Sequence, residues 1–105
     1  MQTIVLPRIH IQGGGLGQRT VELAGATTVG RAADNAIVLD DSSVSRTHAM
    51  LLVEDEDVLL LDLESSNGTS VNGRPALPDE PVRLADGDVV TIGKIILRYE
   101  APHSS

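Results

Sequence analysis

The chain has 105 residues, of which 41% are hydrophobic, and a formal net charge of −7. This length suits one domain, and 31 leucine, isoleucine and valine residues can supply its core, so wholesale disorder is excluded. The absence of cysteine excludes disulfides and thiolate metal sites, and an acidic chain with one aromatic residue is a poor binder of nucleic acid.

The N-terminal segment lacks the basic-then-apolar order of a secretory signal. Its first residues, 1–3, are expected to form a loose tail. No apolar run in the chain is long enough to span a bilayer as a helix. We therefore expect a cytoplasmic protein without a membrane partner.

Apolar and polar residues alternate along most of the chain, which is the period of a β-strand. Turn formers such as Asn72-Gly73 separate the alternating segments at intervals of about 8–12 residues. The pattern predicts an all-β sandwich or barrel over residues 4–100, and a C-terminal tail at 101–105. The predicted strands are residues 4–11, 19–24, 26–31, 36–39, 47–54, 57–63, 69–72, 74–77, 81–84, 88–92 and 94–100.

Three segments rich in hydrogen-bond donors stand at the ends of predicted strands. Arg31 follows one strand, Ser45 and Arg46 precede another, and residues 65–69 form a loop of serine, asparagine, glycine and threonine. A guanidinium can fork onto an oxyanion, and hydroxyl, amide and backbone N–H groups can add further donors. Because loops at one end of a β-sandwich converge, the three segments together predict an oxyanion receptor with its binding loops at one end.

Ser45, His48 and Asp62 also suggest a hydrolase, but the serine has neither a Gly-x-Ser-x-Gly elbow nor a strand–helix unit around it. His48 is expected instead to hydrogen-bond nearby backbone and to brace the loop. The glycine-rich segment 13–17 lacks the Lys-Ser/Thr of a phosphate loop, and the three histidines are scattered. We therefore expect no enzymatic activity, no metal and no cofactor.

Taken together, these segments resemble the forkhead-associated (FHA) domain family over residues 3–100. The resemblance implies an all-β sandwich of two antiparallel sheets with about eleven strands. Its loops at one end would bind phosphothreonine in a short extended peptide, in Ser/Thr kinase signalling. One position departs from the family pattern, Ala36, where an acidic residue is common. The matching segments are, in order, Gly30-Arg31, Asn35-Ala36-Ile37, Ser45-Arg46-x-His48, Asn67-Gly68-Thr69, Val71-Asn72-Gly73, Leu84-x-x-Gly87-Asp88 and Ile92-Gly93.

The resemblance also divides the site residues into two groups. Those expected to contact the ligand are Arg31, Ser45, Arg46 and Ser66 at the phosphate and Asn67 at the peptide main chain. Those expected to support the site without contact are Gly30, His48 and Gly68. The implied partner is a phosphothreonine-containing protein or peptide, rather than nucleic acid or a membrane.

Two alternatives stay open. A phospho-independent scaffold or interaction domain with the same fold would use a sheet face or a strand edge. A phosphothreonine within a longer form of the chain would be an intramolecular ligand. Thr3 is the only threonine of the N-terminal tail, and that tail is too short to fold back comfortably.

Overall fold

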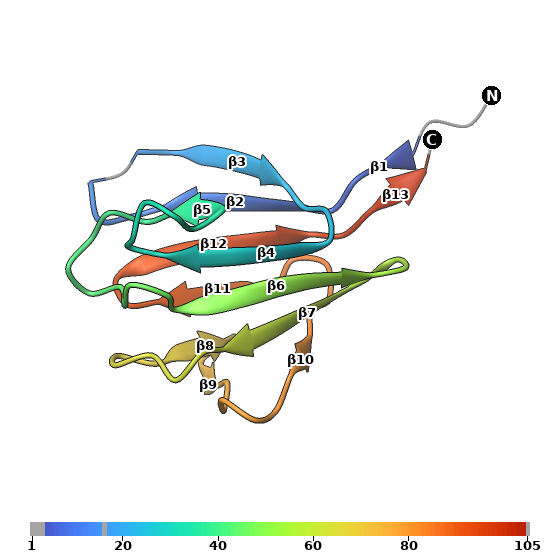
Figure 1. Ribbon diagram of the computed structural model, residues 1–105. Coiled ribbons are helices and arrows are strands. Elements are labelled where there is room, and N and C mark those ends of the chain that lie inside the picture. Colours follow the sequence, from blue (N-terminus) through green and yellow to red (C-terminus); the bar gives the residue numbers. More distant parts are fainter. Residues whose placement is uncertain (1–3, 16, 105) are drawn as a thin grey trace.

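The protein folds as a β-sandwich in which two sheets pack face to face (Figure 1). The computed structural model describes residues 4–15 and 17–104, so the predicted loose tail at residues 1–3 lies outside the described residues. The described residues form strands, turns and bends and contain no helix. The prediction of an all-β sandwich is confirmed.

The first sheet has five strands among the described residues. All neighbouring strands pair antiparallel except β4 and β5, which run parallel with Val29 opposite Ile37. This parallel pair departs from the predicted antiparallel arrangement. Residues 31–36 carry the chain back beside β4, so that β5 runs alongside the end of β4 in the same direction. In spatial order the strands are β10 (Val82–Arg83), β7 (Asp57–Asp62), β6 (Ala49–Glu54), β4 (Ala26–Gly30) and β5 (Ile37–Val38).

The second sheet has six described strands, all paired antiparallel. With the first sheet it makes up the predicted number of about eleven strands. In spatial order the strands are β3 (Arg19–Glu22), β2 (Arg8–Gln12), β12 (Ile95–Glu100), β11 (Val89–Ile92), β8 (Thr69–Val71) and β9 (Arg74–Pro75).

Beyond the sandwich, the two ends of the chain pair with each other as β1 (Ile4–Val5) and β13 (His103–Ser104) (Figure 1). The predicted strand 4–11 is therefore divided in two. Pro7 cannot donate a ladder hydrogen bond, and its carbonyl accepts the N–H of Leu23 at 2.8 Å. The C-terminal segment, predicted as a tail, contributes β13. Its pairing with β1 depends on the two ends of the chain meeting in space.

The core lies between the sheets and follows the predicted alternation. In β12, for example, Ile95, Leu97 and Tyr99 are buried, whereas Ile96 and Arg98 are exposed. Among the described residues, four of the five buried polar side chains lie in or next to the loops described below: Asn35, His48, Asp62 and Thr69. The fifth, Thr27, donates to the carbonyl of Ala24 at the other end of β4. Within the described ranges there is no helix with the length and apolar character that a membrane crossing needs.

Candidate functional site

The three donor-rich segments meet at the end of the sandwich opposite the chain termini (Figure 1). The backbone N–H of Arg31 donates to the carbonyl of Ser45 at 2.9 Å, which joins the end of β4 to the loop before β6. The backbone N–H of Ser66 donates to the hydroxyl oxygen of Ser45 at 2.9 Å, which joins that loop to the one between β7 and β8. Ser45 therefore stands at the junction of the three segments.

Arg31 is held at one nitrogen and open at the others. Its Nε donates to the carbonyl of Val44 at 3.0 Å, and this bond fixes the orientation of the guanidinium. Among the described residues no carboxylate forms an ion pair with Arg31. The two terminal nitrogens remain a planar pair of donors, which is the geometry that binds a carboxylate or phosphate in bidentate fashion.

Gly30 brings the backbone of this region close together. A Cβ built on Gly30 would lie 2.2 Å from the carbonyl oxygen of Arg46, a distance that no side chain tolerates. That carbonyl also accepts hydrogen bonds from the backbone N–H of Ala32 at 3.1 Å and from Nδ2 of Asn35 at 2.7 Å. The close approach explains why glycine precedes Arg31.

Ser45 and Arg46 present donors outward. The Ser45 oxygen accepts the Ser66 N–H, and its hydroxyl proton has no acceptor among the described residues. The backbone N–H of Arg46 has no hydrogen-bond partner within residues 4–15 and 17–104, although its carbonyl is fully engaged. Ser66 and Arg46 are exposed at the rim, and Ser45 is half-buried.

His48 connects two loops from inside the protein. The buried ring accepts the Ser45 N–H at Nδ1 (3.0 Å), so Nε2 carries the proton and donates to the carbonyl of Gly68 at 2.9 Å. Both ring nitrogens are thus committed to backbone groups, as the bracing role requires. The ring has no free nitrogen with which to act as a base on Ser45.

Asp62 organises the loop between β7 and β8. Its buried carboxylate accepts the hydroxyl of Ser65 at 2.5 Å, the backbone N–H of Ser65 at 3.2 Å and the hydroxyl of Thr69 at 2.6 Å. Burial raises the pKa of Asp62, but these hydrogen bonds and the nearby His48 outweigh it and lower the pKa below its ordinary value. Asp62 therefore supports the loop as a carboxylate and does not contact His48 as a catalytic acid would.

Asn67 is hydrogen-bonded to Ser43, a residue that the sequence motifs did not indicate as part of the site. Its Nδ2 donates to the carbonyl of Ser43 at 2.8 Å, and its Oδ1 and second N–H have no partner among the described residues. The Ser43 hydroxyl donates to Asp41 at 2.6 Å and accepts the N–H of Lys94 at 2.8 Å. A Cβ on Gly93 would lie 2.4 Å from the same hydroxyl oxygen.

The hydrogen bonds from the side chain and backbone of Ser43, helped by the charge of Lys94, lower the pKa of Asp41. The signal available in the sequence was Asp41-Ser42-Ser43, the pattern of an Asx-turn. That pattern predicts the local bond from Ser43 to Asp41. It does not predict that Asn67 and Lys94 join the turn.

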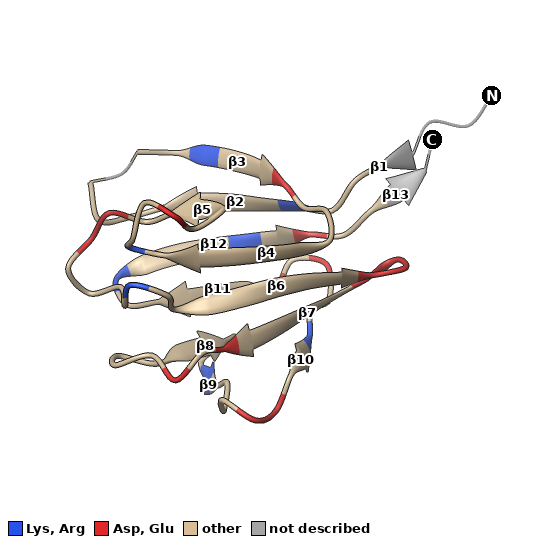
Figure 2. Cartoon of the chain, in the orientation of Figure 1, with Lys and Arg blue, Asp and Glu red and all other residues tan. Residues whose placement is uncertain are grey.

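Basic residues stand among acidic ones in the loops at this end of the chain (Figure 2). Arg31 at the end of β4, Arg46 before β6 and Lys94 between β11 and β12 are three of the eight lysine and arginine residues. Acidic residues also occur in these loops, but Asp41 is occupied by Ser43. The arrangement offers charge and hydrogen-bond donors to an anion, without a nucleophile activated by a base.

Comparison with known proteins agrees with this geometry. A family model described as the FHA domain matches residues 27–93. The chain belongs to the FHA domain family. The predicted family membership is thereby confirmed, and domains of this family are interaction modules rather than enzymes.

The sequence relatives are longer proteins. The FHA domain-containing protein FhaA of Mycobacterium tuberculosis is 41% identical over 83 residues, which cover 76% of this chain and 15% of that protein. The glycogen accumulation regulator GarA of the same species is 45% identical over 73 residues, covering 70% of this chain and 43% of GarA. This chain therefore spans less than half the length of either relative.

Two solved structures share the fold. The crystal structure of the FhaA FHA domain complexed with the intracellular domain of Rv3910 has a TM-score of 0.80 and 34% identity, covering 90% of this chain and 99% of that chain. Mycobacterium tuberculosis EmbR in complex with a low-affinity phosphopeptide has a TM-score of 0.76 and 34% identity, covering 89% of this chain and 24% of that chain.

Proposed function

We propose that this chain is a phosphothreonine-dependent module that binds a peptide segment of a partner protein in Ser/Thr kinase signalling. The observation that carries the proposal is Arg31, whose terminal nitrogens have no carboxylate partner among the described residues and whose Nε is fixed by Val44. The converged loops that carry Ser45 and Ser66 surround this guanidinium with neutral donors.

The chemistry of phosphate suits these donors. A phosphate monoester carries about −1.5 to −2 charges at pH 7 and has three acceptor oxygens. We assign Arg31, the hydroxyls of Ser45 and Ser66, and the backbone N–H of Arg46 to those oxygens. Each hydrogen bond to a charged group is worth roughly 1.5–3 kcal/mol, so a few such bonds can anchor a short peptide. Asn67 would hold the peptide main chain through the amide groups that Ser43 leaves open.

The fold relatives support phosphopeptides as the ligand class. One solved structure concerns phosphothreonine-dependent FHA domain interactions and has a TM-score of 0.77 and 34% identity to this chain. EmbR was solved with a phosphopeptide. A preference for phosphothreonine over phosphoserine would come from burial of the γ-methyl group, which is worth about 1–3 kcal/mol. Ser/Thr kinases use ATP of the cytoplasm, so the proposal places the module there.

A phosphothreonine in a flanking segment would have to reach the far end of the molecule. The chain ends lie together at the end opposite the binding loops, and the long axis measures 45 Å (Figure 1). An extended segment spans at most about 3.3–3.6 Å per residue, so it needs roughly 13 residues to return along that axis. Thr3 directly precedes β1 and lies outside the described residues, and its separation from β1 is far shorter than this.

Fluorescence anisotropy with a labelled phosphothreonine peptide selected from an oriented library tests the proposal. The phosphothreonine peptide should bind, its phosphoserine version about tenfold or more weakly, and its unphosphorylated version not measurably. Arg31→Ala removes two donors to a charged group and should weaken binding roughly 100-fold or more, with the domain still folded. The matched control is Arg83→Ala on β10, where the side chain is exposed and 3.8 Å from Asp57.

Two results would contradict the proposal. If Arg31→Ala binds as tightly as the wild type, Arg31 does not hold the phosphate. If a partner binds equally well before and after phosphatase treatment, the chain is a phospho-independent scaffold of the same fold.

A further inference from the structure

The outer face of the six-stranded sheet carries a second feature unlike the rest of the surface. Alternate residues of β2 and β12 point away from the core, so that Arg98 lies opposite His10 and Ile96 opposite Gln12. These residues, with side chains from β3 and β11, line a shallow hollow of about 250 Å³. Its charged and apolar lining includes His10, Arg19, Val89, Ile96 and Arg98.

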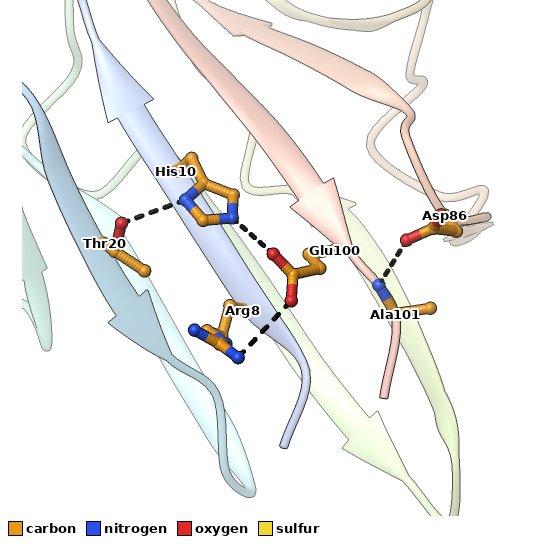
Figure 3. A network of polar contacts seen from close by, with 6 residues as sticks. All are labelled: Arg8, His10, Thr20, Asp86, Glu100 and Ala101. Carbon is orange, nitrogen blue, oxygen red and sulfur yellow. Dashed lines mark hydrogen bonds and ion pairs between the residues drawn. The ribbon is translucent and has the colours of Figure 1, made fainter. Parts of the chain in front are cut away.

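The charges of this hollow are unexpected in a chain with 15 acidic and eight basic residues. Figure 3 shows where the nearest acid is directed: Glu100 accepts from His10 at 2.8 Å and pairs with Arg8 at 3.5 Å. Glu22, the other acid of this face, stands opposite Arg8, at the end of the face away from the hollow. The acids of the face are thus concentrated around Arg8.

Arg19 and Arg98 are left without an acidic neighbour in ion-pair range among the described residues. Arg19 has one long hydrogen bond, 3.5 Å from its Nη1 to the carbonyl of Val38. The two guanidiniums line the same hollow from β3 and β12. Together they form a cationic pair that no acid of the described chain neutralises.

Apolar surface lies directly beside these arginines. Ile96 is 38% exposed and Val89 is 36% exposed, and both are among the five large apolar side chains that the described part of the protein exposes. Val89 is the register partner of Arg98, and Ile96 precedes Arg98 by two residues on the same face. The hollow therefore offers an aliphatic surface bordered by positive charge, which complements an acidic segment that also carries an apolar side chain.

A second hollow lies between this one and the proposed phosphate site. It is smaller, about 190 Å³, and is lined by Asn67, Ser70, Thr91 and Gly93, among others. Thr91 is the register partner of Ile96, so the linings of the two hollows are neighbours across β11 and β12. A peptide held at Asn67 can continue over Thr91 onto Ile96 and Arg98 without leaving the surface.

We propose that the outer face of the six-stranded sheet is a second contact surface for the phosphorylated partner, and that it takes an acidic segment with an apolar side chain. The carboxylates of the segment would lie at Arg19 and Arg98, and its apolar side chain on Ile96 and Val89. This inference rests on the proposed function, because the partner is anchored at Arg31. The second contact would raise affinity by converting a weak interaction into an intramolecular one.

The test uses three synthetic peptides with the same phosphothreonine core. The first is the core alone. The second adds, through a Gly-Ser linker, a segment of alternating leucine and acidic residues. The third adds the same segment with glutamine and asparagine in place of the acids. Each extended peptide is made in two forms, with the extension before or after the core. The acidic extension should increase affinity roughly tenfold over the core, and the neutral one by less. The gain should shrink at high salt, where exposed charges are screened.

Variants of the protein test whether the gain in peptide affinity comes from the outer face of the six-stranded sheet. Arg98→Glu should abolish the gain from the acidic extension and leave the affinity for the core peptide unchanged. The matched control is Arg83→Glu, the same charge reversal on β10, which should keep the gain. A nitrogen-15 NMR titration should show the acidic extension shifting the amides of Val89, Ile96 and Arg98, and the core alone should not shift them.

The outcomes separate the two proposals. If the core peptide does not bind, the proposed function fails, and the inference fails with it. If the core binds and the acidic extension adds nothing, or if Arg98→Glu keeps the gain, only the second contact is overturned.

Discussion

His48 should support the phosphopeptide site without contacting the ligand, and His48→Ala separates these roles. The side chain is fully buried and bonds the Ser45 N–H and the Gly68 carbonyl. Its removal leaves one partly buried backbone donor and one acceptor unpaired, at up to about 1–3 kcal/mol each, and leaves a cavity where the buried ring was, so we expect a loss of about 4 kcal/mol in the free energy of unfolding. At roughly 4–8 °C per kcal/mol for a small domain, the melting temperature should fall by about 16–32 °C.

The assay combines thermal unfolding with phosphopeptide binding, measured below the melting transition of the variant. His48→Ala should lose both stability and affinity, because Ser45 and the loop of Gly68 are no longer held together. Arg31→Ala should lose affinity with its melting temperature within a few degrees of the wild type, because its side chain is exposed and makes one internal hydrogen bond among the described residues. A melting temperature for His48→Ala within about 5 °C of the wild type would refute the bracing role.

Three further predictions follow from the same contacts. Phosphopeptide affinity should fall as the pH drops below about 6, where the phosphate gains a proton, and a flat titration between pH 5 and 7.5 would contradict a site for the dianion. Because the pKa of Asp62 is lowered from its ordinary value of 3.8, its stabilising effect should be fully present above that pH and lost as the pH falls through the folded-state value. Urea unfolding should therefore show Asp62→Asn less stable than the wild type at pH 7, with the difference shrinking as the pH falls below 3.8; a constant difference would argue against the charge. Gly30→Ala should destabilise the domain by about 2–4 kcal/mol in the same assay, because its Cβ meets the carbonyl of Arg46, and wild-type stability would rule out that close approach.

The strands could be predicted because each long strand has one face in the core. In β12 the alternation of Ile95, Leu97 and Tyr99 with exposed residues is visible in the sequence, and burial reproduces it. The short elements gave no such signal. The two residues of β5 are too few to show a period or a direction, and β13 exists because it meets β1 at the other end of the chain.

Candidate ligand contacts could be nominated for a similar reason. Arg31 and Ser45 stand at strand ends, and their side chains offer the donors that an oxyanion needs. The residues that hold those contacts in place are harder to find. Ser43 accepts from Lys94, which is 51 residues away, and His48 donates to Gly68 across two strands. Such bonds depend on which loops meet in space, and local sequence patterns carry no information on that.

The distribution of charge reconciles an acidic chain with an anionic ligand. At physiological salt the interaction between exposed charges is screened beyond about 8 Å, so a phosphate at Arg31 interacts with the loops and little with distant acids. The acidic turn Glu54–Asp57 lies between β6 and β7, at the end of these strands away from the binding loops (Figure 2). A long polyanion such as nucleic acid would have to extend beyond the binding end and meet those acids, of which Asp57 has one base nearby, Arg83 at 3.8 Å. A single phosphate on a peptide meets the donors and bases of the binding loops at short range. Arg19 and Arg98, which have no ion-pair partner among the described residues, remain available for an acidic segment of the partner.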